Sequence, residues 1–464
     1  MNDCTFVLFG ASGDLAKRKL IPALYRLYVH KRMHKLLIIG AALDDISVEL
    51  LLDAARSYIA DYDCVMYTEF AQCIRYQKLD FYNAQDFVAL STHLEAHEKS
   101  FGMSGNRIFY LATASHFFCQ ITQQLASAGL AKKWNKHDAV HHRIVYEKPF
   151  GHDLASAHAI NECIASLYQE QQIYRIDHYL TKELVGNIAL IRFTNCVFEP
   201  LWNNRYIDNI QIILSEHVSV GSRGGYYDSY GALCDVVQNH MLEMVALLGM
   251  ESPEKLTGEY IRNQRADVIK KITIDDVLLG QYEGYLQEPG VASHSTVETF
   301  ALVKLMINNS RWAGVPFYLK TGKALDKKET IIYIKFKKVD CLLAKNCPTD
   351  SNYLTIRVTP NALFSLSLNA KKPGQADEII PVIMDFAHSK LFGPVTPESY
   401  EVIFEDVMRN EQSISVRFDE IEFAWRAIAN IKQLHAPLYY YKKGSKGPQE
   451  IAEFEHKHGM KWRS

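Results

Sequence analysis

The first thirty residues restrict the fold more than any other part of the sequence. The segment TFVLFGASGDLAKRKLIPALYRLY, residues 5–28, passes from an apolar run through two glycines into a pattern with leucine at roughly helical spacing. A strand that turns tightly into an amphipathic helix is the usual start of a βαβ unit. The segment therefore predicts that the chain opens with a parallel sheet.

The same pattern continues through the following residues. Apolar segments at residues 35–43, 106–113 and 141–151 are predicted strands, and stretches with helical periodicity separate them. Strands that alternate with helices form a parallel, doubly wound sheet. We predict an α/β, Rossmann-like dinucleotide-binding domain at residues 1–175.

The second part of the chain has a different pattern. Segments such as TIIYIKFKKV, YLTIRVTP and ALFSLSLNAK follow one another with more alternation and fewer intervening helices. Alternation of apolar and polar residues is typical of antiparallel strands. Residues 176–464 are therefore predicted to form an α+β domain with a large, mainly antiparallel sheet, for substrate binding and oligomerisation. The boundary is expected between about residue 170 and residue 185.

The charge balance argues against two classes of partner. Lys and Arg number 51 against 53 Asp and Glu, a formal net charge of −2, which predicts neither nucleic-acid binding nor attraction to an anionic membrane. The longest aliphatic run, LLIIGAAL, is far shorter than the ~20 apolar residues of a membrane span. The N-terminus has an acid where a signal peptide has basic residues, so we expect a cytoplasmic protein.

The cysteines and histidines predict no metal site. The 9 cysteines are scattered without a CxxC pair, and an odd number suits free thiols in a reducing compartment. Cys341 and Cys347 are expected to be structural or exposed. His137, His141 and His142 have no neighbouring ligand set, so a solvated loop before a strand is expected there.

Two turns are candidates for ligand binding. In GASGDLA, Gly10–Ala16, the glycines would let backbone N–H groups approach a pyrophosphate at the start of a helix. The alternative is a plain strand-to-helix connection, but the position at the start of a βα series favours a dinucleotide site. In YEKPFG, Lys148 follows the fourth predicted strand and would donate to a substrate or nicotinamide group, although a surface turn is more common.

Two other motifs are uninformative when taken alone. RIDHYLTKE, residues 175–183, contains Arg, Asp, His, Lys and Glu with a tyrosine, a composition that usually forms a solvated turn. His240 lies on a predicted helix at residues 231–250, and a single histidine on such a helix is more often a core or surface residue than a catalytic one. Neither motif by itself predicts a function.

Taken together, the motifs resemble one family. GASGDLAKRKL, EKPFG, RIDHYLTKE, SRGGYYDSYGALCDVVQNH and TGKALDKKE, in this order, closely resemble the glucose-6-phosphate 1-dehydrogenase family, from about residue 5 to YYYKKGSKGPQE near the C-terminus. The resemblance implies oxidation of C1 of β-D-glucose 6-phosphate to 6-phospho-D-glucono-1,5-lactone, with hydride transfer to NADP or NAD. This is the first step of the oxidative pentose phosphate pathway. The resemblance also implies a homodimer or homotetramer.

The resemblance assigns substrate-binding residues. A dianionic phosphate needs several cationic or hydrogen-bonding groups, and RIDHYLTKE supplies them. The implied ligands are His178, Tyr179, Lys182 and Lys328 for the phosphate, Lys323 for the sugar or phosphate, and Lys148, Glu216 and Asp235 for the sugar hydroxyls.

The resemblance also assigns catalytic and cofactor residues. His240 would be the base, since imidazole has an unperturbed pKa that suits proton transfer near neutrality. Asp177 would orient His240 and stabilise the imidazolium, and Lys19 would affect catalysis or cofactor placement. No metal is needed. The implied cofactor-binding residues are Gly10, Ser12, Gly13, Asp14, Leu15, Lys19, Asp44, Glu147 and Lys148.

The chain departs from the family after its second predicted strand. Many NADP-using members have an arginine there for the 2′-phosphate, whereas this chain has Leu43, followed by Asp44 and Asp45. A carboxylate at this position favours an unphosphorylated ribose. We expect the enzyme to prefer NAD or to use both cofactors, unless Lys17 or Lys19 replaces the arginine.

Two other functions remain open from the sequence. The scaffold would also serve a different hexose phosphate, for example one with an amino group at C2. A catalytically silent protein would retain the fold in order to bind NADP or a sugar phosphate as a regulator. The presence of Asp177, His240 and the phosphate-binding lysines argues against silence, because function resides in the site and not in the fold.

Overall fold

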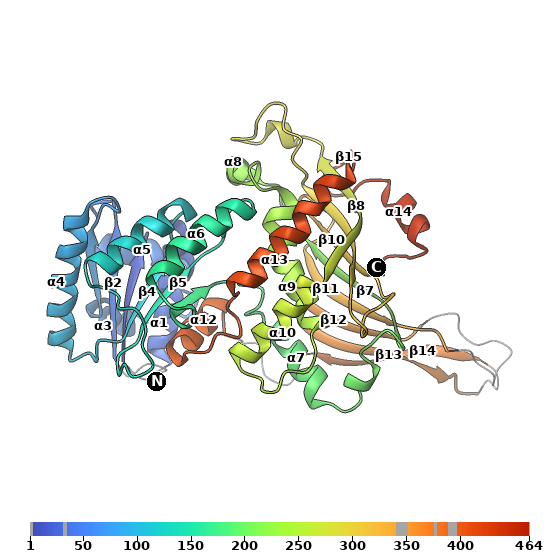
Figure 1. The fold of residues 1–464 in the computed structure, drawn as a ribbon, viewed down its shortest axis with the longest axis horizontal. Helices are drawn as coiled ribbons and strands as arrows, with labels where there is room; N and C mark the ends of the chain where they lie inside the picture. The colour runs from blue at the N-terminus through green and yellow to red at the C-terminus, as the bar shows by residue number, and fades with distance from the viewer. Residues whose placement is uncertain (1–2, 31–34, 340–350, 375–377, 388–396, 464) are drawn as a thin grey trace. The chain divides into compact units, whose positions relative to one another are not determined.

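The structure is a computed structural model that describes residues 3–30, 35–339, 351–374, 378–387 and 397–463 (Figure 1). Its contacts divide the chain into two compact units. Unit 1 consists of Met1–Thr181, Lys255–Arg262 and Pro397–Ile421, and unit 2 of Lys182–Glu254, Asn263–Thr396 and Glu422–Ser464. Two late segments thus pack with the N-terminal part of the chain, whereas the sequence predicts a single boundary between two continuous domains.

Unit 1 is built on a parallel sheet, as predicted. In the described residues this sheet has six strands in the order β3-β2-β1-β4-β5-β6, and each neighbouring pair runs parallel. The strands are β1 (Cys4–Phe9), β2 (Leu36–Ala42), β3 (Ile74–Lys78), β4 (Arg107–Leu111), β5 (His142–Tyr146) and β6 (Ile173–Arg175). All their carboxyl ends therefore lie at one edge, the edge at which such sheets bind ligands.

Helices cover both faces of this sheet (Figure 1). One face packs against α1 (Ile21–Val29), α2 (Val48–Arg56) and α3 (Cys64–Gln72), and the other against α4 (Ala84–Phe101), α5 (Phe118–Ser127) and α6 (Leu154–Leu167). Because both faces are covered, β1 and β2 are buried at every position, and their sequences are continuous apolar runs. The predicted Rossmann-like domain is confirmed.

Four of these strands were predicted from the sequence, whereas β3 and β6 were not. The sequence of β3 is IRYQK, in which only Ile74 is fully buried, and β6 has only 3 residues. Strands this polar or this short do not show the apolar pattern on which the prediction depends.

The segment Pro397–Ile421 completes the core of unit 1. Its helix α12 (Ser399–Arg409) places the ring of Phe404 against Phe6 of β1 and Tyr110 of β4, with ring centroids 5.2 and 5.6 Å apart. All three rings are buried. The N-terminal sheet therefore depends on a helix from far along the chain.

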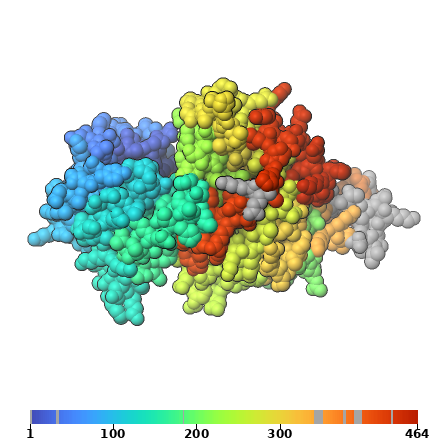
Figure 2. Space-filling model, turned by 45° about the horizontal axis from the view of Figure 1, so that its top comes forward, coloured from blue at the N-terminus to red at the C-terminus, as the bar shows by residue number. Residues whose placement is uncertain are grey.

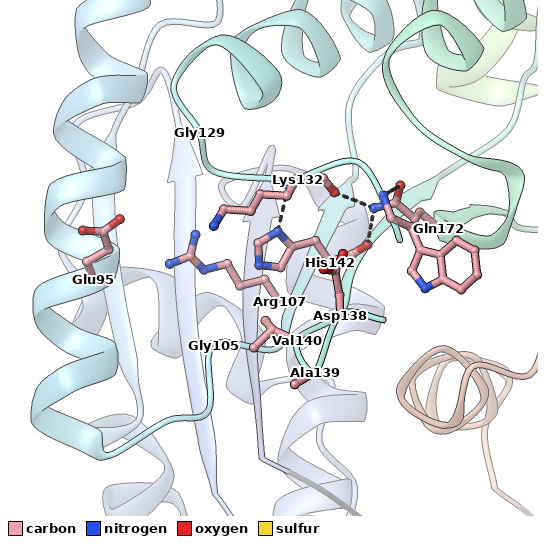
Figure 3. A pocket seen from close by; sticks show the side chains of 11 residues that line it. Glu95, Gly105, Arg107, Gly129, Lys132, Asp138, Ala139, Val140, His142 and Gln172 are labelled. Atoms are coloured by element: carbon pink, nitrogen blue, oxygen red, sulfur yellow. Dashed lines mark hydrogen bonds between the residues drawn. The ribbon is translucent and has the colours of Figure 1, made fainter. Parts of the chain in front are cut away.

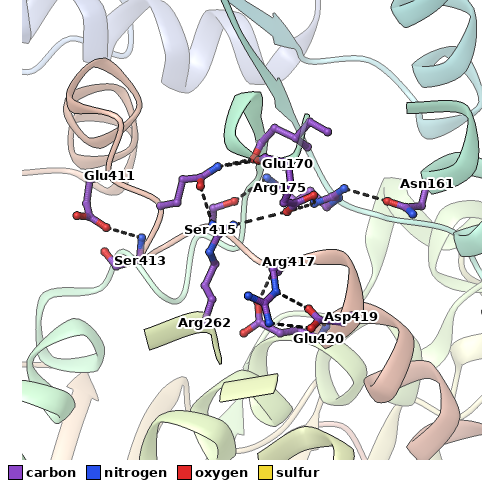
Figure 4. A network of polar contacts seen from close by, with 12 residues as sticks. Asn161, Glu170, Arg175, Arg262, Glu411, Ser413, Ser415, Arg417, Asp419 and Glu420 are labelled. Carbon is purple, nitrogen blue, oxygen red and sulfur yellow. Dashed lines mark hydrogen bonds and ion pairs between the residues drawn. The ribbon is translucent and has the colours of Figure 1, made fainter. Parts of the chain in front are cut away.

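A polar network holds the rest of this segment against β6 (Figure 4). Arg175, the last residue of β6, is buried and donates to both carboxylate oxygens of Glu170, at 2.8 and 3.0 Å, and to Asn161 Oδ1 at 3.1 Å. Its backbone N–H donates to Ser415 Oγ at 3.0 Å. The first residue of RIDHYLTKE is therefore structural, and its charge is balanced inside unit 1.

Two cysteines of unit 1 are bonded to each other. Cys119 of α5 and Cys163 of α6 form a disulfide, with Cα atoms 5.9 Å apart. The prediction of free thiols is wrong for this pair, because folding brings two helices on the same face of the sheet together although 44 residues separate the cysteines. The free cysteines of the described residues are Cys4, Cys64, Cys73, Cys196 and Cys234. Cys341 and Cys347 lie outside the described residues.

Unit 2 is built on a large sheet. In the described residues it has nine strands, in the order β14-β13-β12-β11-β7-β10-β9-β8-β15. They are β7 (Ile207–Ser215), β8 (Ile272–Tyr282), β9 (Phe300–Ile307), β10 (Phe317–Gly322), β11 (Glu329–Phe336), β12 (Tyr353–Thr359), β13 (Leu363–Lys371), β14 (Ile379–Ala387) and β15 (Leu438–Tyr441). Most pairs are antiparallel, which confirms the predicted sheet.

Two neighbouring pairs in this sheet are parallel, β7 with β10 and β8 with β15. In the first pair Ser215 lies opposite Gly322, the last residues of β7 and β10. The residues that follow, Glu216 and Lys323, therefore leave the sheet at the same end.

Helices and the C-terminal residues pack around this sheet. The described residues of unit 2 include the helices α7 (Glu183–Thr194), α8 (Gly224–Tyr227), a π-helix (Leu233–Met241), α9 (Leu242–Gly249), α14 (Ile451–His458) and most of α10 (Gly258–Lys270) and α13 (Phe418–Ala429). Figure 2 shows the C-terminal residues, in deep red, on the surface of unit 2, where Phe454 of α14 packs against Tyr318 of β10. In the described part of the chain, each helix is too short or too polar to span a bilayer.

Candidate active site

The turn after β1 is shaped to approach a phosphate group. Gly10 has a φ of +79°, and a Cβ atom there would lie 2.6 Å from the carbonyl oxygen of Ala112. Gly13 donates its N–H to the Gly10 carbonyl at 2.9 Å, and the chain becomes helical directly afterwards. N–H groups at the start of a helix bind anions, so this turn fits the pyrophosphate of a dinucleotide. The predicted cofactor residues Gly10, Ser12, Gly13, Asp14 and Leu15 all lie in it.

The end of β2 places a carboxylate beside this turn. The hydroxyl of Ser12 donates a hydrogen bond to the carboxylate of Asp44. The backbone carbonyl of Asp44 accepts a hydrogen bond of 2.7 Å from the hydroxyl of Tyr76 on β3. The side chain of Leu43 is 62% exposed. The Gly-rich turn and Asp44 are thus in contact, as expected of groups that would bind one dinucleotide.

Lys19 lies in the first helical segment after the turn, which is wound as a π-helix over Ala16–Leu20. Its amine lies 3.5 Å from the carboxylate of Glu398, directly before α12, and both side chains are half-exposed. A π-helical turn is rare and often occurs at functional sites. The structure thus gives Lys19 an acidic partner in unit 1.

The end of β5 carries Glu147 and Lys148, and Glu147 is bound by tyrosines. The hydroxyl of Tyr110 donates to Glu147 Oε1 at 2.5 Å. Burial raises the pKa of Glu147, and the hydroxyls of Tyr110 and Tyr400 counteract this effect. Glu147 was predicted to bind the cofactor, and in this structure its carboxyl belongs to a tyrosine cluster.

The motif RIDHYLTKE leaves the sheet beside Lys148. The N–H of Ile176 donates to the Tyr146 carbonyl at 3.0 Å, so β5 and β6 end side by side. Asp177 is buried, and its Oδ1 accepts the N–H of Tyr179 at 2.9 Å. The rings of His178 and Tyr179 lie with centroids 4.8 Å apart. The edge of the unit 1 sheet thus gathers Lys148, Asp177, His178 and Tyr179.

In unit 2 the parallel strands β7 and β10 bring Glu216 and Lys323 together. The amine of Lys323 forms an ion pair with the carboxylate of Glu216. The N–H of Glu216 also donates to the Gly322 carbonyl at 3.0 Å. The amine of Lys323 lies over the ring of Tyr227, 5.4 Å from its centroid. A cation and an anion are thus held where the two strands end.

The helix with Asp235 and His240 follows α8. The sequence predicts a helix over residues 231–250, and in the structure Leu233–Met241 is a π-helix that precedes α9. His240 is 2% exposed. The hydroxyl of Tyr226 lies 3.4 Å from Asp235 Oδ1. Both π-helices described here carry residues predicted for the site.

The two halves of the sequence match two families of domains. The model of the glucose-6-phosphate dehydrogenase NAD binding domain matches residues 7–187, and that of the glucose-6-phosphate dehydrogenase C-terminal domain matches residues 189–463. The chain belongs to the glucose-6-phosphate dehydrogenase family. Because its N-terminal half is the NAD binding domain of this family, its cofactor is a nicotinamide dinucleotide.

Individual members of the glucose-6-phosphate dehydrogenase family match the whole chain. The glucose-6-phosphate 1-dehydrogenase of Bacillus subtilis (strain 168) is 38% identical over 482 residues, which cover 98% of this chain and 97% of that protein. The enzyme of Chlamydia pneumoniae is 36% identical, with 99% of this chain and 96% of that protein covered. A solved glucose-6-phosphate dehydrogenase in complex with glucose 6-phosphate is 32% identical and has a TM-score of 0.91. The match covers 100% of this chain and 99% of that chain.

The structure groups most predicted substrate residues within their own unit. In unit 1, Lys148, His178 and Tyr179 follow adjacent strands, and in unit 2 Tyr226 and Tyr227 link Asp235 to Lys323 and Glu216. Lys182 directly precedes α7 and is half-buried. Lys328 is exposed in the turn before β11 and stays a prediction.

Glu298, which binds the start of the helix with Asp235, was not predicted from the sequence. Leu233 donates its backbone N–H to Glu298 Oε1 at 2.9 Å. Glu298 lies 65 residues away in a polar segment without a motif, so no local pattern indicates this contact. Tyr227 was also missed as a neighbour of Lys323.

A cavity of about 360 Å³ lies at the other edge of the unit 1 sheet (Figure 3). Arg107 and His142, the first residues of β4 and β5, line it. Arg107 donates to both carboxylate oxygens of Glu98 at 3.0 and 2.7 Å, and His142 Nδ1 accepts the N–H of Lys132 at 2.9 Å. Burial lowers the pKa of His142 to about 4. The expectation of a solvated loop is wrong for His142, because this residue is the first of β5 and its side chain is buried.

Proposed function

We propose that this protein oxidises C1 of β-D-glucose 6-phosphate to 6-phospho-D-glucono-1,5-lactone. The observation that carries the proposal is the match, over the whole chain, to a glucose-6-phosphate dehydrogenase solved with its substrate glucose 6-phosphate. The predicted substrate and catalytic residues are present in the chain, and within each unit most of them gather at one end of a sheet.

The proposed chemistry removes a hydride from C1 and a proton from its hydroxyl. His240 takes the hydroxyl proton, because neutral imidazole is the side chain best suited to a base near pH 7. Asp177 is proposed to orient His240 and to stabilise the imidazolium that forms. When bound, the nicotinamide ring accepts the hydride. The products are the lactone, the reduced dinucleotide and one proton.

The remaining residues are proposed to fix the sugar phosphate. His178, Tyr179, Lys182 and Lys328 hold the phosphate, since a dianion needs several charge-assisted hydrogen bonds. Lys323 reaches the sugar or phosphate, and Lys148, Glu216 and Asp235 bind the sugar hydroxyls. The ion pair between Lys323 and Glu216 supports this part of the proposal, because it holds both side chains in a defined position without a ligand.

The preferred cofactor is proposed to be NAD. The support comes from the end of β2, where the carboxylate of Asp44 contacts Ser12 in the Gly-rich turn. A carboxylate there accepts hydrogen bonds from a ribose and repels a 2′-phosphate. Leu43 supplies no positive charge. Binding of NADP instead through Lys17 or Lys19 is the alternative.

The test measures the formation of reduced nicotinamide with glucose 6-phosphate and either NAD or NADP, over a range of each cofactor. We expect turnover with both and a higher kcat/KM with NAD. Turnover with a strong preference for NADP would support the proposed dehydrogenase activity and contradict the proposed preference for NAD. Absence of turnover with either would lead to other hexose phosphates, including a 2-amino sugar phosphate, and then to a silent binding protein.

We also propose that the protein is a homodimer or homotetramer. The edge strand β14 of the unit 2 sheet exposes apolar side chains, with Ile383 65% and Met384 63% exposed. Val382 and Phe386 on the same strand are each 37% exposed. An edge strand with exposed apolar residues is a surface that a second chain would cover. A cytoplasmic location belongs to the proposal, and the name of the 36% identical cytoplasmic isoform of Solanum tuberosum supports it.

The double substitution Ile383→Glu and Met384→Lys is expected to convert the oligomer into monomers, because charges on both faces of β14 oppose burial. Size-exclusion chromatography with light scattering measures the mass. Leu50→Glu, at an exposed position of α2 in unit 1, is the matched control and should leave the mass unchanged. An unchanged oligomer in the double variant would place the interface elsewhere.

A further inference from the structure

The helix that carries Asp235 and His240 begins against one short segment of unit 2. The N–H of Ala232 donates to the carbonyl of Glu298 at 3.0 Å, and the N–H of Leu233 donates to Glu298 Oε1 at 2.9 Å. The first N–H groups of a helix have no partner within the helix. Glu298 thus supplies two of the missing acceptors, and a carboxylate also interacts favourably with the positive end of the helix.

Gly231, two residues before Leu233, leaves room for the carboxylate. Gly231 has a φ of +67°, and a Cβ atom there would overlap the carboxylate of Glu298. Any larger residue at this position would therefore push the Glu298 side chain away from the helix. The glycine and the glutamate act together, since one makes room for the contact that the other provides.

The same segment also holds the turn with Lys323. The N–H of Lys323 donates to the carbonyl of Thr299 at 2.9 Å. The hydroxyl of Tyr441 donates to the Lys323 carbonyl at 2.7 Å and lies 2.9 Å from Thr299 Oγ1. Residues 298 and 299 therefore connect the helix and the lysine that are proposed to bind the sugar phosphate.

We propose that Glu298 is a positioning residue: its carboxylate fixes the start of the helix that carries Asp235 and His240, and this sets the affinity for the sugar phosphate. The inference rests on the proposed function and deepens it. We do not propose that Glu298 contacts the substrate. Its effect passes through Leu233 to Asp235, two residues farther along the same helix.

The contact between Glu298 and the helix changes with pH. Burial raises the pKa of Glu298 to about 7, and the hydrogen bond from Leu233 opposes this shift. Tyr227 and Tyr285 are titratable side chains near Glu298, and burial raises the pKa of each above its ordinary value, so both stay neutral. Below about pH 7 the group is a neutral acid and a weaker acceptor, and above it is a carboxylate. The affinity for glucose 6-phosphate should therefore fall as the pH is lowered.

The test measures kcat and KM for glucose 6-phosphate between pH 6 and pH 8. Glu298→Gln keeps the shape but cannot ionise, so we expect its KM to exceed that of the wild type on the order of five- to tenfold at pH 8 and to approach it at pH 6. Its kcat should change less than twofold. Gly231→Ala, which displaces the carboxylate, should also raise KM at pH 8.

The control is Asp406→Asn in α12, since burial also raises the pKa of Asp406, to about 6, but that carboxyl lies in unit 1. It should leave the pH dependence of KM unchanged. The inference would be overturned, and the proposed function would stand, if Glu298→Gln had the KM and the pH profile of the wild type. Gly231→Ala serves for the same comparison if the first variant does not fold. Absence of turnover by the wild-type protein at pH 8 would overturn the proposed function and the inference with it.

Discussion

His240→Asn should lower kcat on the order of 10²- to 10⁴-fold and leave KM for glucose 6-phosphate nearly unchanged. Asparagine is smaller than histidine but keeps a polar atom at the position of Nδ1, so the helix should keep its shape, but an amide cannot accept a proton near neutrality. His240 is buried, and its backbone N–H already bonds the Asn239 side chain at 2.7 Å. The substitution thus removes the proposed base and little else.

Steady-state rates and binding of glucose 6-phosphate, measured by calorimetry, separate the two effects. His458→Asn is the matched control, because the side chain of His458 in unit 2 is only 8% exposed and its partner is Asp276, 2.7 Å away and outside the proposed site. The control should keep its kcat. If His240→Asn retained more than a tenth of the wild-type kcat, another group would have to be the base.

The double substitution Leu43→Arg and Asp44→Ser should raise the ratio of kcat/KM for NADP to that for NAD on the order of 10²-fold. A charge-assisted hydrogen bond contributes about 1.5–3 kcal/mol, which corresponds to about 10- to 100-fold. Removal of the carboxylate adds to this effect, because Asp44 no longer repels a 2′-phosphate. In the wild-type chain the hydroxyl of Ser12 contacts Asp44, and a serine at position 44 would still offer Ser12 a polar group.

Initial rates with each cofactor at saturating glucose 6-phosphate give the ratio. Asp45→Asn is the control: Asp45 is the next residue and is exposed, and its carboxylate pairs with Lys78 at 3.6 Å. We expect the control to change the ratio less than threefold. An unchanged ratio in the double variant would mean that the ribose is recognised by other residues, for which Lys17 and Lys19 are the first candidates.

The fold was predictable from the sequence where buried strands are long enough to show a pattern of apolar residues. β1 and β2 are covered on both faces, so their apolar runs were found, and the alternating segments of unit 2 indicated an antiparallel sheet. β6 was missed because a strand of 3 residues is too short to show a recognisable pattern of apolar and polar residues. The disulfide between Cys119 and Cys163 was missed because the sequence does not show which helices share a face of the sheet.

The motifs of the sequence indicated the candidate site, but the residues that hold this site in place could not be predicted. RIDHYLTKE looked like one charged cluster, yet Arg175 is used for packing against Glu170 while Asp177 and His178 follow at the sheet edge. The turn around Asp235 is π-helical, which the spacing of apolar residues does not distinguish from an α-helix. Glu298 acts across a distance in sequence that no motif spans.

The contact of Phe404 with Phe6 and Tyr110 has a consequence for synthesis of the chain. The ribosome releases β1 and β4 early, and it releases α12 only after strands β7 to β14 of the unit 2 sheet have been translated. Until then the apolar surface that receives Phe404 has no native cover. The first strands to emerge therefore belong to a unit that is finished late, and the nascent protein must pass through a state with an open core, which is when such chains are most prone to aggregate.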